Sequence, residues 1–174
     1  MNSIIVASNK KKAGKTSVAS ALSNHLNANN VKSVILNTQY GNKKSNFSEE
    51  LGLEIINSSF AEDGDIGKLS KVIIKNAKGN ILISESNAID SKVNVEISKK
   101  SNSKILYVAS INEDMDSIVK YYGESLGGIV LNKIPRHRYE EILKKYDSLP
   151  FLGYIPDNRY LISNTVDQFA KHLD

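Results

Sequence analysis

Short runs of β-branched and other apolar residues alternate along the chain with longer segments whose apolar residues recur at helical spacing. This alternation is typical of βα units wound around a parallel sheet. The runs are almost entirely apolar, as expected for strands that helices cover on both faces. We therefore predict six strands, at Ser3–Ala7, Ser33–Leu36, Asn80–Ser84, Lys104–Ala109, Gly128–Leu131 and Phe151–Ile155.

The segments between these runs predict helices, and right-handed crossovers would place them on both faces of the sheet. No internal repeat or linker of biased composition interrupts the 174 residues, so we expect one domain over residues 1–174. The predicted helices are Lys15–Asn29, Asp65–Asn76, Val93–Lys100, Asp114–Tyr122, Arg138–Tyr146 and Thr165–Leu173.

Composition removes several classes of protein. The absence of cysteine excludes disulfide scaffolds, thiolate metal sites and cysteine nucleophiles, and three scattered histidines argue against a zinc site. The N-terminal apolar run precedes the charges, which reverses the order of a secretory signal, and no run reaches membrane-spanning length. We therefore expect a cytoplasmic protein with no membrane partner.

The net charge of +4 is concentrated in one place. Lys10, Lys11, Lys12 and Lys15 lie within a single short loop, while the other lysines are interspersed with acids. A cluster of this size indicates a small polyanion such as a nucleotide rather than the extended basic face that nucleic acid requires.

That loop, SNKKKAGKTS at residues 8–17, follows the first predicted strand and precedes the first predicted helix, which is the context of a Walker A phosphate loop. Amide groups at a helix start bind phosphate oxygens. Gly14 permits close backbone approach, Lys15 can reach the β and γ phosphates, and the Thr16 hydroxyl can ligate Mg²⁺. The remaining candidates for phosphate contact are Asn9, Lys11, Lys12, Ala13 and Ser17.

Two loop positions depart from the usual pattern. Asn9 replaces its first glycine, and we expect the turn to survive because asparagine tolerates left-handed backbone angles. Lys10 matches the additional lysine of the deviant Walker A signature, which contacts phosphate, often across a dimer. Beside Lys11 and Lys12 it can equally be one more loop lysine.

Three blocks together resemble the dethiobiotin synthetase and cobyrinic acid a,c-diamide synthase group of P-loop proteins, in particular the dethiobiotin-synthetase-like N-terminal domain of phosphotransacetylases. The blocks are the loop with TSVASALSNHL after it, NILISESNAID, and GGIVLNKIPRHRYEEILKKYDSLPFLGYIPDNRYLISNTVDQFAKHL. The resemblance implies the three-layer P-loop NTPase fold, an α/β architecture with a mostly parallel sheet of about six strands and helices on both faces. It also implies ATP and Mg²⁺ as cofactors and a homodimer as the expected assembly.

The resemblance extends to individual residues. Glu85 ends a predicted strand where the group holds Mg²⁺, although a solvated strand-end acid is the alternative. Asn132 and the segment from Pro156 through Asp157 to Asn158 correspond to the adenine side of the pocket, although each also fits plain turn chemistry. Asp63 or Asp65 could supply a further metal carboxylate.

Three functions are consistent with these residues. The first is an ATP-dependent ligase or kinase that activates a small carboxylate-type substrate, with Lys15 and Lys10 stabilising the transferring phosphoryl group. Asn37, Thr38 and Gln39 follow the second strand where dethiobiotin synthetase carries a substrate lysine. The alternatives are a nucleotide sensor without significant turnover and a partitioning-type ATPase that dimerises on ATP.

Overall fold

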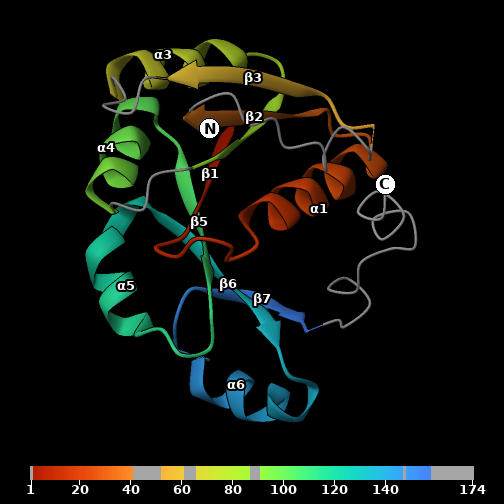
Figure 1. The fold of residues 1–174 in the computed structure, drawn as a ribbon, viewed down its shortest axis with the longest axis vertical. Coiled ribbons are helices and arrows are strands. Elements are labelled where there is room, and N and C mark those ends of the chain that lie inside the picture. The colour runs from red at the N-terminus through yellow and green to blue at the C-terminus, as the bar shows by residue number, and fades with distance from the viewer. Residues whose placement is uncertain (1, 41–51, 61–65, 87–90, 147, 158–174) are drawn as a thin grey trace, which may run out of the picture.

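The computed structural model describes residues 2–40, 52–60, 66–86, 91–146 and 148–157. It contains a parallel sheet of seven strands in the order β3-β2-β4-β1-β5-β6-β7 (Figure 1). The predicted α/β class is confirmed, with one strand more than the six expected. The strands are β1 Ser3–Ala7, β2 Ser33–Tyr40, β3 Ile55–Phe60, β4 Ile81–Glu85, β5 Lys104–Ala109, β6 Leu126–Ile134 and β7 Phe151–Pro156.

Helices cover both faces of the sheet, as predicted. On one face α1 packs through a small cluster that contains Val6, Val18 and Val108. The other helices pack on the opposite face through the larger apolar cluster (Figure 1). The helices are α1 Lys15–Ala28, α3 Ile66–Asn76, α4 Ser91–Ser101, α5 Met115–Tyr122 and α6 Tyr139–Tyr146, with short 3-10 turns at Gly123–Ser125 and Arg136–Arg138.

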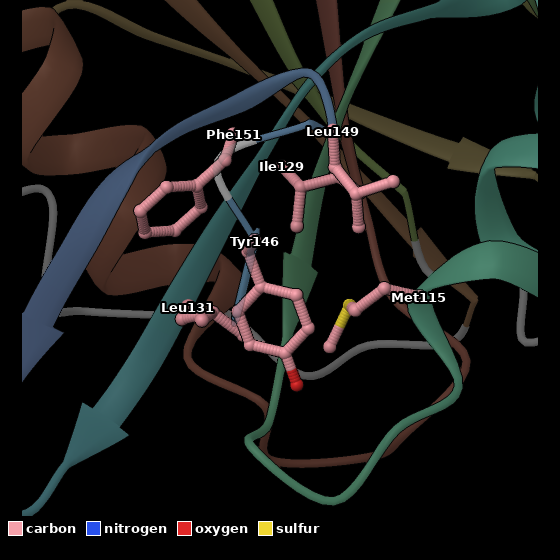
Figure 2. A pocket seen from close by; sticks show the side chains of 6 residues that line it. All are labelled: Met115, Ile129, Leu131, Tyr146, Leu149 and Phe151. Atoms are coloured by element: carbon pink, nitrogen blue, oxygen red, sulfur yellow. The ribbon is translucent and has the colours of Figure 1, made fainter. Parts of the chain in front are cut away.

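The seam between α5, α6 and the strands β6 and β7 is apolar. Figure 2 shows six side chains that converge there, including Met115, Leu131, Tyr146 and Phe151. They leave no space for a water molecule, and the Tyr146 and Phe151 rings lie 6.3 Å apart. This contact is core packing that holds α6 on the sheet, and it offers no ligand site.

The strand register brings the carboxyl ends of the central strands to one edge of the sheet. Val6 pairs with Glu85, Ala7 with Tyr107, and Ala109 with Leu131. Ligands bind at this edge in open α/β sheets. The loops after β1, β4, β5 and β6 therefore meet where the sequence places the phosphate site.

Some predictions lie outside the described residues, namely the helix Thr165–Leu173 and the candidates Asp63, Asp65 and Asn158. The prediction of one domain over residues 1–174 stays a prediction. Within the described ranges, every helix is too short or too polar to span a bilayer.

Candidate nucleotide-binding site

The loop from Ser8 to Gly14 connects β1 to α1 and ends in a left-handed residue. Gly14 is the N-cap of α1, with φ of 93° and no side chain to cap the helix, and no acidic residue lies in the first turn. Amide groups at such a start lack intrahelical partners, and the helix dipole adds partial positive charge. The start of α1 is therefore suited to bind an anion.

Lys15 and Thr16, in the first turn of α1, meet Glu85 at the end of β4. The Thr16 hydroxyl donates a hydrogen bond of 2.7 Å to Glu85 Oε1. Glu85 is 9% exposed, so the alternative of a solvated strand-end acid is wrong. One hydroxyl and one carboxylate thus share a site whose oxygen atoms are of the kind Mg²⁺ prefers.

Burial shifts the pKa values of both charged groups at this point. It raises the pKa of Glu85, while the hydrogen bond from Thr16 and the charge of Lys15 lower it. Burial also lowers the pKa of Lys15, and the charge of Glu85 opposes that change. Each ion is costly to bury and is partly stabilised by the other.

Asn9, which replaces the first glycine of the motif, is held by three hydroxyl groups. Its N–H donates to Tyr107 Oη at 3.1 Å, and its Oδ1 accepts from Ser91 Oγ at 2.9 Å and from Tyr122 Oη at 3.2 Å. Positive φ in this loop occurs at Lys12 and Gly14, and not at Asn9. The expectation that asparagine is tolerated here for its left-handed conformation was therefore wrong, because its side chain anchors the loop instead.

Lys10 is held within its own chain. Its Nζ donates to Ser110 Oγ at 2.9 Å and lies 3.7 Å from Glu113 Oε1. Glu113 in turn accepts from Tyr107 Oη at 2.8 Å and from the Ser110 N–H at 2.7 Å. Lys10 is about half exposed and is attached by a contact that costs little to break.

Asn132, at the end of β6, braces the second half of the loop. Its Nδ2 donates to the Ala13 carbonyl at 2.8 Å, and its Oδ1 accepts from the Lys133 N–H at 2.9 Å. Lys133 has φ of 59° but lies within β6, so the turn expected at this position is instead an irregularity of the strand, where the register with β7 shifts between Leu131 and Ile134. Asn132 therefore contacts the phosphate loop directly, which was not expected of an adenine-side residue.

The other predicted residues lie around this centre. Lys11, Lys12 and Ser17 are exposed, and Ala13 is half-buried. Pro156 and Asp157 are exposed at the end of β7, where the Asp157 N–H donates to the Ile134 carbonyl at 2.9 Å. They lie at the same sheet edge as Asn132, beside β6.

Sequence reasoning missed the residues that support the loop from β5, α4 and α5. Tyr107 is the only signal that could have found them, because a tyrosine in an otherwise aliphatic buried strand needs a partner for its hydroxyl. Burial is the main cause of the raised pKa of Tyr107, so its hydroxyl keeps the proton that it donates to Glu113. Ser91, Glu113 and Tyr122 carry no local signal.

Structures of known proteins resemble this one over most of its length. The cell division protein MinD of Aquifex aeolicus matches with TM-score 0.65 and 15% identity over 93% of this chain and 85% of its own. MinD of Pyrococcus horikoshii, complexed with Mg-ADP, matches with TM-score 0.59 and 18% identity over 91% and 82%. A protein assigned to plasmid partition from Borrelia burgdorferi B31, bound to AMPPNP, matches with TM-score 0.60 and 13% identity over 98% of each chain.

These similarities establish the fold. The chain has the P-loop NTPase fold, in the form found in MinD and in the plasmid partition protein. No family model matches the sequence, and no curated protein does. The narrower resemblance to the dethiobiotin synthetase group is not confirmed.

Proposed function

We propose that this chain binds ATP with Mg²⁺ and uses the bound nucleotide to control its association with a second copy, as a partitioning-type ATPase. The observation that carries the proposal is the uncapped start of α1, with Lys15 beside the hydrogen-bonded pair Thr16 and Glu85. It combines the three groups that a nucleoside triphosphate needs, which are amide donors, an ammonium ion and oxygen ligands for a cation.

The residues present fit both cofactors. Loop amides and Lys15 would hold the phosphates, while Thr16 and Glu85 would hold Mg²⁺, which neutralises charge on the phosphate oxygens when bound. Asn132, Pro156 and Asp157 lie at the same sheet edge, where they would border the base. The Asn132 amide would serve the base indirectly, through the loop that it braces.

The partitioning-type proposal has more support than the ligase that the sequence suggested. Two of the similar structures hold ADP with magnesium or an ATP analogue, and one of these matches over 98% of both chains. A complex of MinC with MinD is also among the similar structures, with TM-score 0.62. Ligase activity and a nucleotide sensor without turnover stay predictions.

We expect the mass of the wild-type protein to double in the presence of Mg²⁺ and a non-hydrolysable ATP analogue. Only a weak contact with Ser110 and Glu113 holds Lys10 within its own chain, so Lys10 would be able to reach the nucleotide of the second copy. Lys10→Ala should therefore bind the analogue but remain monomeric. Light scattering coupled to size-exclusion chromatography measures both masses. Lys71→Ala on α3, an exposed lysine far along the chain, is the control. A wild-type mass that ignores the nucleotide would contradict the proposal.

We expect Glu85→Gln to weaken ATP binding in Mg²⁺ far more than in a chelator, because it removes a metal ligand and leaves the amide donors intact. The variant has a second signature without nucleotide. Since burial raises the folded pKa of Glu85, the wild type loses stability as pH rises from about 4.5 through that raised pKa. Glu85→Gln should lack this loss, which thermal unfolding against pH would detect. Equal weakening with and without Mg²⁺ would identify a purely structural acid.

A further inference from the structure

A cavity of about 300 Å³ borders the phosphate loop at Asn9. Asn9 contributes from the loop, Ser91 from the start of α4, and the rest of the lining comes from α5 and the turn before it. Asn132 braces the other end of the same loop, so the cavity is separate from the predicted base side. The proposed function assigns no ligand to this space.

The lining of the cavity is acidic. The described residues that line it include Glu113 and Asp114, and none of them is a lysine, arginine or histidine. Hydrogen bonds from Ser117 lower the pKa of Asp114, so this carboxyl group remains ionised at neutral pH. The Glu113 carboxylate is fixed by Tyr107 and Ser110, which prevents it from turning away.

The structure already contains an ammonium group beside one of these carboxylates. Lys10 Nζ approaches Glu113 Oε1 to 3.7 Å from the loop, and also donates to Ser110 Oγ. Glu113 is therefore placed where it attracts a cation. Its side chain is only 9% exposed, so a competing cation would reach it from the side that the half-exposed Lys10 now occupies.

Aromatic side chains form another part of the lining. Tyr121, which is 47% exposed, and Tyr122 have ring centroids 5.6 Å apart and lie nearly edge to face. Ring faces attract organic cations as well as apolar carbon. A bare metal ion suits the cavity less well, because no group of three metal-binding side chains occurs in the described part of the chain.

We propose that this cavity binds a small organic cation, an ammonium or guanidinium compound, between the carboxylates of Glu113 and Asp114 and the exposed ring of Tyr121, which packs on the buried ring of Tyr122. Its volume lies at the lower end of the range that small-ligand sites have. The proposal goes beyond the proposed function and does not require nucleotide binding, although the ligand would touch Asn9 and so contact the phosphate loop.

Putrescine is the test probe, and 1,4-butanediol is its neutral counterpart of the same length. Calorimetry on the full chain should show saturable binding of putrescine and none of the diol. The amide NMR signals of Asn9, Ser91 and Ser117 should shift with the same affinity. Equal binding of the diol, or shifts confined to other surfaces, would overturn the proposal.

Variants show whether putrescine binding depends on the charge of the two carboxylates rather than on an intact fold. Glu113→Gln keeps one acceptor oxygen for the Ser110 N–H and places an NH2 group beside the Tyr107 hydroxyl, which can turn to accept from it. It removes the charge and should weaken putrescine about tenfold, which corresponds to ~1.4 kcal/mol. Asp114→Ser keeps a capping side chain for α5 but removes the charge, so it should also weaken binding and remain folded. Tyr121→Leu should weaken it about threefold. Wild-type affinity in the first two variants would overturn the proposal.

The control is Glu96→Gln, which removes an exposed acid of α4 that is paired with Lys100 and does not line the cavity. It should leave putrescine affinity unchanged. Lys15→Ala should lose ATP and keep putrescine, so a failure of the nucleotide proposal and a failure of the cation site give different results.

Discussion

Lys15→Ala is expected to bind ATP roughly 100-fold more weakly than the wild type while remaining folded. Charge-assisted hydrogen bonds contribute ~1.5–3 kcal/mol each, and a tenfold change in affinity corresponds to ~1.4 kcal/mol. The stability of the folded protein should change little, because the cost of burying the Lys15 ammonium ion offsets the stabilisation that its charge gives to Glu85. Calorimetry with ATP and Mg²⁺, beside thermal unfolding without nucleotide, measures the two effects.

Two further variants test whether the loss of affinity is specific to the Lys15 side chain. Lys15→Arg keeps the charge but has a longer, planar head group, so it should recover only part of the affinity. Lys71→Ala removes an exposed lysine of α3 and tests whether net charge alone matters. If Lys15→Ala binds ATP as the wild type does, the phosphates lie elsewhere and the proposed function fails.

The sequence predicted the central strands and the place of the phosphate loop because both depend on local pattern. β1 and β5 have the predicted bounds, since each is a short apolar run with clear breaks on both sides. The loop between β1 and α1 follows from the same pattern, together with the Gly14, Lys15 and Thr16 motif. Buried parallel strands are the elements that periodicity identifies best.

The sequence did not predict β3, because three polar residues separate its first two apolar residues, Ile55 and Ile56, from Phe60. It lies at the edge of the sheet and pairs only with β2, so one side of its backbone needs no strand partner. An edge strand requires less apolar surface than a central one, which removes the signal on which the prediction rests.

The support of Asn9 was missed for a different reason. Its partners Ser91, Tyr107 and Tyr122 lie 82, 98 and 113 residues away in the sequence. No local pattern encodes such contacts, and only the crossing of β5, α4 and α5 behind the loop creates them. At this position three hydroxyl groups perform the task that the usual glycine performs through backbone freedom, so the loop is fixed from outside rather than by its own conformation.

Gly14→Ala is expected to destabilise the protein and to abolish ATP binding. Gly14 has φ of 93°, and a Cβ atom there would lie 2.0 Å from Asn132 Nδ2. The left-handed conformation costs an L-residue ~1–2 kcal/mol, and the overlap must displace either the loop or the amide that braces it. Either movement disturbs the amide groups at the start of α1, which are the proposed phosphate donors.

Gly79→Ala supplies the matched control, because Gly79 has φ of 81° and open space where its Cβ would lie. It should cost only the conformational term and leave ATP binding intact. The double variant Gly14→Ala with Asn132→Ala removes the overlap, so it should be less destabilised than the sum of the two single variants. Denaturant unfolding could instead show that the losses in free energy of unfolding are additive, or that Gly14→Ala and Gly79→Ala lose the same amount. In either case the Asn132 side chain would not be in close contact with Gly14. The link between the end of β6 and the phosphate site would then be wrong, even if Lys15 binds ATP as proposed.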